Sequence, residues 1–210
     1  MFHLNSNSSF RGSDAADEKS RRFFNRVAFA FPLIERALLP GYRQALAATR
    51  LDTALTVLDL GTGTGILAAA FAERGHVVKG LDFAQRLLQR AVRRHPTVAF
   101  ELFNLADLDS LPTNSWDVVS MGYLLHGLDR EFRQAVLREA ARIANSHVLI
   151  FDYGEPGNAL VRFIEWIEGP HYPEFLRDSR AIDFARAGLT LRHHRPMRGS
   201  GAMWLCVPDS

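Results

Sequence analysis

The chain has 210 residues, of which 47% are hydrophobic and 23% are charged, and its formal net charge is +2. This length is sufficient for one α/β domain with a well-buried core, and so small a net charge does not favour a nucleic-acid partner. The one cysteine, Cys206, excludes an internal disulfide and a cysteine-rich metal site. No run of about 18 apolar residues is present for a membrane span, and residues 5–22 are too polar for a secretory signal. We therefore expect a cytoplasmic protein.

No internal repeat and no linker divides the chain. Residues 1–20 are rich in Ser, Asn and Asp and predict a mobile tail, which leaves residues 21–210 as a single domain. An N-terminal helical cap is predicted over residues 18–50. A turn-rich region predicts a lid over the substrate at residues 154–180.

The cap contains two predicted helices. Residues 18–39 have helical character, with a break or kink at Pro32, because proline lacks the N–H that a helix interior requires. Pro40 and Gly41 predict a separation from a short helix at residues 42–49. The cap is rich in aromatic and aliphatic side chains, so it can cover a core or a pocket.

Residues 57–65, with the sequence VLDLGTGTG, are the most informative stretch of the chain. A short apolar run enters a loop with three glycines, Gly61, Gly63 and Gly65, and residues 66–74 follow with helical character. A strand, a tight turn and a helix N-terminus form the arrangement in which backbone approaches a nucleotide-like ligand. Glycines permit that approach because they have no Cβ and adopt positive φ.

A second predicted strand, at residues 76–81, ends at Asp82. Its carboxylate can accept hydrogen bonds from ribose hydroxyls, although it can also cap the helix predicted at residues 84–94. The ligand is therefore expected to contain a nucleoside. In the dinucleotide fingerprint G-x-G-x-x-G the third glycine comes one residue later, where this chain has Ile66. The loop alone leaves S-adenosylmethionine (SAM) and NAD open.

The alternation of strands and helices continues along the chain and predicts an α/β fold with a parallel sheet and right-handed crossovers. Further strands are predicted at 98–103, 115–120 and 147–153, and a further helix at 130–144. After these, helices are predicted at 159–168 and 178–187, and a hairpin at 190–194 and 202–207. Ligands of such sheets bind at the carboxyl ends of the strands. Four side chains at or just past the ends of predicted strands should therefore line one crevice: Asp59, Asp82, Asp107 and Tyr123.

The pattern D-x-G-x-G-x-G that begins at Asp59 resembles motif I of the class I SAM-dependent methyltransferases. Three later segments resemble that family in the same order: ADLDSLP at 106–112, SWDVVS at 115–120 and LLHGLD at 124–129. Ordered matches are more specific than any one motif. The resemblance implies a Rossmann-like, doubly wound, seven-stranded sheet that is mostly parallel with an antiparallel last strand, preceded by N-terminal helices. It also implies methyl transfer from SAM, with S-adenosylhomocysteine as product.

Two segments resemble the ubiquinone/menaquinone-biosynthesis C-methyltransferases: residues 24–31 (FNRVAFAF) and residues 150–156 (IFDYGEP). There are departures from that group, since Phe31 replaces a tyrosine, Pro32 replaces an acid, and residues 142–146 lack the usual Pro-Gly-Gly turn. We expect a small, apolar or aromatic acceptor rather than a specific quinone. Nucleic-acid methylation is disfavoured, because SMGY follows the fourth strand in place of an Asn/Asp-Pro-Pro-aromatic motif.

The resemblance implies a set of cofactor-binding residues. The glycine loop would hold the aminoacyl end of SAM, Asp82 would bind both ribose hydroxyls, and Asp107, in competition with Asp109, would accept the adenine amino hydrogens. Asp59 either contacts the ligand or supports the loop. The expected cofactor-binding residues are Asp59, Gly61, Thr62, Gly63, Gly65, Asp82, Phe83, Asp107, Leu108 and Met121. No metal is expected.

Methyl transfer from a sulfonium is an in-line displacement, so alignment alone can supply much of the acceleration. Candidate catalytic residues are His126, whose ordinary pKa lies near the operating pH, and Tyr123, which would line the acceptor pocket. A histidine after an apolar run can equally be a packed structural residue. The oligomeric state is expected to be a monomer or a homodimer, and peripheral membrane contact is open. Two alternatives stay open: a non-catalytic SAM-binding partner subunit and an NAD-dependent oxidoreductase.

Overall fold

The computed structural model describes residues 31–49, 51, 54–155, 171–178, 184–197 and 200–209. The strands are β1 (Thr56–Leu60), β2 (Val77–Asp82), β3 (Ala99–Leu102), β4 (Trp116–Gly122), β5 (Ala144–Tyr153), β6 (Leu189–Pro196) and β7 (Gly201–Pro208). The α-helices are α2 (Phe31–Ala47), α3 (Ile66–Ala72), α4 (Gln85–Arg94), α5 (Arg130–Ile143) and α7 (His171–Asp178). Short 3-10 helices are η1 (Leu105–Ser110), η2 (Leu125–Gly127) and η4 (Ala185–Ala187).

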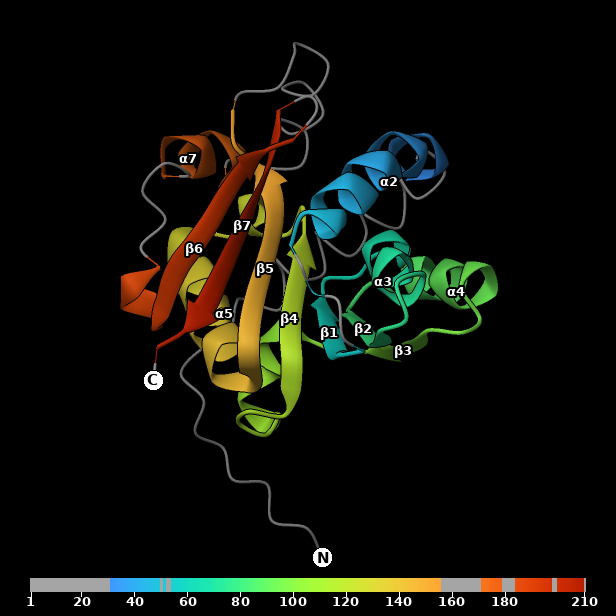
Figure 1. The fold of residues 1–210 in the computed structure, drawn as a ribbon, viewed down its shortest axis with the longest axis horizontal. Coiled ribbons are helices and arrows are strands. Elements are labelled where there is room, and N and C mark those ends of the chain that lie inside the picture. Colours follow the sequence, from blue (N-terminus) through green and yellow to red (C-terminus); the bar gives the residue numbers. More distant parts are fainter. Residues whose placement is uncertain are drawn as a thin grey trace, which may run out of the picture.

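The seven strands form one sheet with the order β3-β2-β1-β4-β5-β7-β6 (Figure 1). Neighbours from β3 to β5 are parallel, whereas β7 is antiparallel to both β5 and β6. The predicted Rossmann-like sheet with an antiparallel last strand is confirmed. The strand order reverses between β1 and β4, and α/β sheets bind ligands at the carboxyl ends of strands beside such a reversal.

Alternate residues of the central strands enter two separate cores, one on each face of the sheet. Leu58 of β1 and Val119 of β4 belong to the core that includes α5 and α7. Their neighbours Val57 and Val118 belong to the core that includes α2 and α3. A strand buried on both faces has little room for polar side chains, which explains why these strands have near-continuous apolar sequences.

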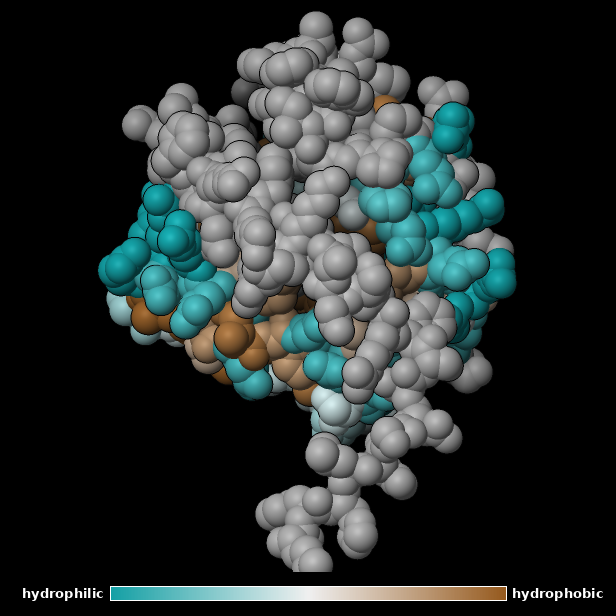
Figure 2. Space-filling view, turned by 180° about the vertical axis from the view of Figure 1, so that it is seen from behind, coloured by the Kyte–Doolittle hydropathy of each residue, from teal (hydrophilic) through white to brown (hydrophobic). Residues whose placement is uncertain are grey.

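The two edges of the sheet carry charged residues. On β6, Arg192 and Arg195 lie on a largely exposed strand, and on the other edge Glu101 of β3 pairs with Lys79 of β2. Charged side chains on edge strands disfavour pairing with another chain. In the described part of the rear face, Figure 2 shows an apolar band bordered by hydrophilic residues. Leu102 of β3 is among the exposed apolar side chains, at 58%.

The prediction that Pro40 and Gly41 separate two helices is wrong, because α2 runs through both. A proline in a helix interior removes a hydrogen bond and costs about 3 kcal/mol. The helix is nevertheless retained because its carboxyl half packs in the core, where Tyr42 is 2% and Leu46 is 1% exposed. Pro40 itself is exposed. The break predicted at Pro32 falls next to the boundary of the described residues, which begin at Phe31 in α2.

Two other boundaries differ from prediction. β5 begins at Ala144 rather than His147, because α5 runs directly into the strand and Ala144 already pairs with Trp116 of β4. Of the helix predicted at 178–187, Asp178 ends α7, residues 185–187 form η4 before Gly188 with φ 72°, and residues 179–183 lie outside the described part of the chain.

Several sequence predictions lie outside the described residues: the tail at 1–20, most of the helix at 18–39, the helix at 159–168 and much of the lid at 154–180. None of the helices in the described ranges combines the length and apolarity required to cross a membrane.

Candidate active site

The glycine loop follows β1 and uses three positive φ angles: 63° at Gly61, 56° at Gly63 and 80° at Gly65. The three glycines differ in what surrounds them. A Cβ on Gly65 would lie 2.6 Å from the Phe100 ring, and one on Gly61 would lie 2.7 Å from Leu124, whereas one on Gly63 would meet no heavy atom of the described residues within 4 Å. Gly61 and Gly65 therefore serve close packing. Gly63 leaves bare backbone facing open space, which fits the approach of a ligand.

Asp59 belongs to β1, the strand that leads into this loop, and is 1% exposed. Its carboxylate accepts hydrogen bonds from the hydroxyls of Thr62 and Ser120, each at 2.7 Å. Burial raises the pKa of Asp59 to about 6, against the lowering effect of these two bonds. The bonds connect β1, the glycine loop and β4. This geometry fits the second of the two roles considered for Asp59, support of the glycine loop. Thr62 contributes to the same support through its hydroxyl.

Asp82 ends β2 and is 5% exposed. One carboxylate oxygen accepts the N–H of Gly63 at 2.7 Å, and the other accepts the N–H of Ala84 at 2.7 Å. Burial raises its pKa, opposed chiefly by those backbone bonds. Asp82 therefore both reaches the glycine loop and fixes the backbone where α4 begins. A carboxylate offers about four acceptor positions, so it retains the capacity to bind two ribose hydroxyls as well.

The expected adenine residues lie on η1 and at the end of β4. Asp107 is exposed on η1, as is its competitor Asp109, and the geometry does not separate the two. Leu108 is 1% exposed and Met121 is fully buried, so both are core residues. Phe83 is half-buried beside Asp82.

Tyr123 and His126 follow β4, on the other side of the strand reversal. Tyr123 has a φ of 52°, which is uncommon for a residue with a side chain, and its N–H donates to the carbonyl of Phe151 at 2.6 Å. His126 is 7% exposed. Its Nδ1 lies 2.8 Å from Oδ1 of Asp152, which is 1% exposed near the end of β5. The sequence did not predict this pairing of His126 with Asp152.

Five rings meet beside the carboxyl ends of β4 and β5, and we call them the aromatic cluster: Tyr42, Tyr123, His126, Tyr153 and Phe175. Ring centroids lie 6.4 Å apart for Tyr42 and Tyr123, 5.0 Å for Tyr123 and Tyr153, 4.9 Å for His126 and Tyr153, and 6.3 Å for His126 and Phe175. The helices α2 and α7 thus each supply one ring, and Figure 1 shows both at this end of the sheet. The cluster forms an aromatic wall next to the strand reversal.

Arg133 of α5 joins this region to the rest of the fold. Its guanidinium donates to the carbonyls of Leu125 at 3.1 Å and Leu128 at 2.9 Å, and it lies 5.0 Å from the centre of the Phe175 ring. Sequence reasoning did not identify Arg133, Tyr42 or Phe175 as site residues. The only signal for Tyr42 was the aromatic richness of the cap, since its helix was predicted to be a separate short segment.

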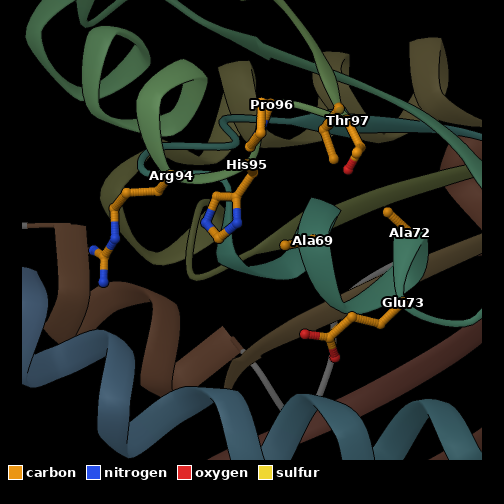
Figure 3. Close-up of a pocket in the computed structure, with 8 residues that line it drawn as sticks. Ala69, Ala72, Glu73, Arg94, His95, Pro96 and Thr97 are labelled. Carbon is orange, nitrogen blue, oxygen red and sulfur yellow. The ribbon is translucent and has the colours of Figure 1, made fainter.

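Figure 3 shows a hollow elsewhere in the molecule, lined by Ala69, Ala72, Glu73, Arg94, His95, Pro96, Thr97 and Val98. These residues precede β2 and β3, so the hollow lies at the amino edge of the sheet, opposite the glycine loop. The carboxylate of Glu73 already accepts two hydrogen bonds from Arg43, at 2.8 and 2.7 Å. Because it lies at the opposite edge of the sheet, the hollow is separate from the candidate active site. Among the described residues, no group of three or more His, Cys, Asp or Glu is arranged to hold a metal ion.

The sheet topology and the glycine loop together define a Rossmann-like fold, in which nucleoside ligands bind at the loop after the first strand. Residues 57–147 match a family described as a methyltransferase domain. A demethylmenaquinone methyltransferase of Tropheryma whipplei is 29% identical over 167 residues, which cover 75% of this chain and 65% of that protein. A 2-heptyl-1-hydroxyquinolin-4(1H)-one methyltransferase of Mycobacteroides abscessus is 32% identical over 124 residues, covering 55% of this chain and 51% of that protein. The chain thus spans less than two thirds of the length of these relatives.

A solved structure of the mitomycin 7-O-methyltransferase MmcR has a TM-score of 0.69 and 18% identity, covering 90% of this chain and 60% of that one. At this identity the likeness concerns the fold. Together with the ordered motifs, the comparisons show that residues 57–147 match a methyltransferase domain and that the chain has the fold of such enzymes.

Proposed function

We propose that this protein transfers the methyl group of SAM to a small, apolar or aromatic acceptor by in-line displacement and releases S-adenosylhomocysteine. One observation carries the proposal: Asp82 binds the N–H of Gly63, the loop glycine with open space above it, at 2.7 Å. A carboxylate and bare backbone are thereby held together at the carboxyl ends of β1 and β2, where a nucleoside cofactor binds in such sheets.

The remaining cofactor contacts are proposed from the family resemblance. The backbone from Gly61 to Gly65 holds the aminoacyl end of SAM. Asp82 accepts both ribose hydroxyls, and such charge-assisted bonds contribute roughly 1.5–3 kcal/mol each before desolvation. Asp107 accepts the adenine amino hydrogens, while Phe83 and Leu108 shape the space for the ring and Met121 supports it from the core. No metal is part of this proposal.

The aromatic cluster supports the nature of the acceptor. Flat aromatic side chains pack well against a flat aromatic ligand, and Tyr123 and His126 lie on the segment after β4, next to the strand reversal. The names of two relatives, a demethylmenaquinone methyltransferase and a hydroxyquinolinone methyltransferase, support an acceptor with fused rings. We propose that the protein acts in the cytoplasm as a monomer or homodimer, without a nucleic-acid partner.

Calorimetric titration with SAM, S-adenosylhomocysteine and NAD tests the cofactor. We expect wild type to bind SAM and its product, and Asp82→Ala to lose about tenfold or more in affinity. Asp117→Ala is the matched control, because Asp117 also accepts a backbone N–H, that of Thr56 at 2.8 Å, but lies at the opposite edge of the sheet. Its SAM affinity should stay within about twofold of wild type.

Each other outcome supports a different function. Tighter binding of NAD than of SAM supports the oxidoreductase alternative. SAM binding without turnover of any quinol, naphthol or hydroxyquinolone acceptor supports the non-catalytic alternative, a SAM-binding partner subunit. Absence of SAM binding contradicts both the proposed methyltransferase function and the SAM-binding partner subunit.

A further inference from the structure

We infer that Arg142 of α5 is a positioning residue for the cofactor base. It holds the crossover between β3 and β4 in the arrangement in which Asp107 selects adenine over a base that lacks the amino group. The inference rests on the proposed function, in which Asp107 accepts the adenine amino hydrogens of SAM. Arg142 contacts neither the cofactor nor the acceptor in this proposal and acts only through the crossover.

The crossover between β3 and β4 differs from the other parallel crossovers of the sheet. β1 and β2 connect through α3, β2 and β3 through α4, and β4 and β5 through α5, whereas residues 103–115, all of them described, contain only η1. η1 has 6 residues and is interrupted at Asp107, where φ is −103° and ψ is 16°. Because 3-10 helices have poorer hydrogen-bond geometry than α-helices, this crossover depends on contacts from other elements.

The guanidinium of Arg142 supplies such contacts. Its Nη2 donates to the carbonyl of Leu108 at 2.9 Å, and its Nη1 donates to the carbonyl of Leu111 at 2.8 Å and to the hydroxyl of Thr113 at 3.1 Å. Its Nε donates at 2.8 Å to Glu139, three residues earlier on the same helix. Because arginine presents its donors in a rigid fork, these bonds together set the distance between α5 and the crossover.

The backbone of Arg142 holds the far end of the same crossover. Its carbonyl accepts the N–H of Asn114 at 2.9 Å, and the carbonyl of Ile143 accepts the N–H of Ser115 at 3.0 Å. These backbone bonds persist when the side chain at position 142 is changed. The side chain is 29% exposed, so a polar replacement does not leave a buried cavity.

The contacts of Arg142 reach the peptide directly after Asp107. Leu108 follows Asp107 in the chain, is 1% exposed, and carries the carbonyl that Arg142 binds. Asp107 is held on its other side, where its N–H donates to the carbonyl of Asn104 at 2.9 Å and its own carbonyl accepts the Ser110 hydroxyl at 2.6 Å. A shift of the guanidinium therefore moves the backbone that carries the Asp107 carboxylate.

A role in stability alone explains this arrangement less well. The carbonyl of Leu108 already accepts the N–H of Leu111 at 3.1 Å, and the hydroxyl of Ser115 donates to the carbonyl of Pro112 at 2.7 Å. The turn after η1 is thus closed without Arg142. Ordering a long arginine side chain costs conformational entropy, and contacts of a partly exposed charged group offset little of that cost. What the guanidinium adds is a fixed position of η1 relative to α5.

A fixed carboxylate distinguishes adenine from hypoxanthine. Adenine has an amino group, which donates hydrogen bonds, where hypoxanthine has a carbonyl oxygen. An ionised carboxylate only accepts hydrogen bonds, so Asp107 binds the first group and repels the second. If the crossover is free to shift, the carboxylate can move away from the hypoxanthine oxygen, and the preference for adenine falls.

The test measures this preference as a ratio of two Kd values. The ligands are S-adenosylhomocysteine and its inosine analogue, in which a carbonyl oxygen replaces the amino group, and both are titrated by calorimetry. We expect wild type to favour S-adenosylhomocysteine by about 20-fold or more, and Arg142→Gln by about threefold or less. A merely structural role would weaken both ligands alike, so an unchanged ratio in Arg142→Gln overturns the inference.

Arg142→Lys provides a second variant that keeps the charge and the aliphatic stem but not the fork. Its ratio should lie between those of wild type and Arg142→Gln. If Arg142→Gln does not fold, Arg142→Lys decides, and the wild-type ratio in that variant overturns the inference.

Asp107→Ala tests whether Arg142 acts through Asp107. We expect this variant to lower the ratio to about threefold or less, and the double variant Asp107→Ala with Arg142→Gln to have the same ratio as Asp107→Ala. Interacting residues give such non-additive effects. A wild-type ratio in Asp107→Ala, or a further fall in the double variant, overturns the inference.

Arg138→Gln and Asp117→Ala are the matched controls. Arg138 is an exposed arginine of the same helix, so its replacement removes the same charge. Asp117→Ala removes the acceptor of the N–H and the hydroxyl of Thr56, both at 2.8 Å, and so lowers stability while the contacts of the Arg142 side chain remain. Both controls should keep the wild-type ratio, and a fall in either as large as in Arg142→Gln overturns the inference.

The affinity of wild type separates the two levels of the argument. If wild type binds neither SAM nor S-adenosylhomocysteine, the proposed function fails and the inference fails with it. If S-adenosylhomocysteine binds and the ratio is the same in wild type and Arg142→Gln, the inference alone fails.

Discussion

Asp59 and Ser120 join β1 to β4 at the point where the strand order reverses, through a hydrogen bond of 2.7 Å from the Ser120 hydroxyl to the carboxylate. Thr62 of the glycine loop donates to the other carboxylate oxygen at 2.7 Å. One buried acid therefore ties both central strands to the loop. Its pKa is nevertheless raised, because burial disfavours the charged form more than the two hydroxyls favour it.

We predict that Asp59 makes the protein less stable as the pH rises from about 4 to about 7. With a folded-state pKa above the unfolded-state value, the folded protein binds more protons in this window, so the free energy of unfolding decreases with rising pH. A shift from 3.8 to about 6 corresponds to roughly 3 kcal/mol. Urea denaturation at a series of pH values should show that the difference between wild type and Asp59→Asn changes by that order.

Asp117→Asn provides a control of opposite sign. The backbone N–H and the hydroxyl of Thr56 donate to Asp117 and lower its pKa. Its stabilising contribution is therefore present above the ordinary carboxyl pKa and is lost as the pH falls. If the difference between wild type and Asp59→Asn is constant across the same pH range, the raised pKa of Asp59 is contradicted.

A second prediction concerns Tyr42 and Gly122. A Cβ on Gly122 would lie 2.6 Å from the Tyr42 hydroxyl and 3.0 Å from Leu67. Gly122→Ala should therefore cost about 1–3 kcal/mol, as is typical of overpacking. Tyr42→Phe removes the hydroxyl, so the double variant should be more stable than the sum of the two single changes predicts. Denaturation of all four proteins gives the coupling free energy, and strictly additive costs would show that the hydroxyl does not occupy that space.

A third prediction separates strain from ligand binding in the glycine loop. Gly63→Ala should cost about 1–2 kcal/mol, the penalty for a left-handed residue with a Cβ, because it meets no neighbour. Gly65→Ala adds a collision with Phe100 and should cost more. Although Gly63→Ala remains folded, its SAM affinity should fall by about tenfold or more, measured by calorimetry.

Gly75→Ala is the matched control for that measurement. Gly75 has a φ of 86° and no heavy atom within 4 Å of a built Cβ, so the strain is comparable, but it lies between α3 and β2 at the opposite edge of the sheet. Its SAM affinity should equal that of wild type. If Gly63→Ala and Gly75→Ala bind SAM equally well, the cofactor does not approach the backbone at Gly63.

The sheet could be predicted from the sequence because its signals are local. The apolar strands, the glycines that require positive φ and the acid after β2 all lie within a few residues of the features that they define. α2 was misjudged at Pro40 for the same reason. The local cost of a proline is visible in the sequence, whereas the burial of Tyr42 and Leu46 that outweighs it depends on tertiary packing.

The partners within the candidate site could not be predicted in the same way. His126 and Asp152 are 26 residues apart in the chain, and their contact depends on the parallel register in which Gly122 pairs with Phe151. Arg133 and Phe175 meet only because α5 and α7 lie on the same face. Composition and periodicity do not encode such contacts between distant segments, so the sequence supplied His126 as a candidate without its partner.

The position of β7 in the sheet has a consequence for folding during synthesis. β7 is the last strand in chain order, yet it lies between β5 and β6, and Met203 and Trp204 are almost fully buried there. While a ribosome is still making the preceding residues, β5 has an open edge on that side, and an open strand edge can pair with other chains. The half of the sheet that carries the glycine loop can form early, whereas the half that carries Asp152 is completed only when β7 emerges. Slow synthesis just before Gly201 should therefore favour aggregation, and chaperones that cover strand edges should be most useful at that stage.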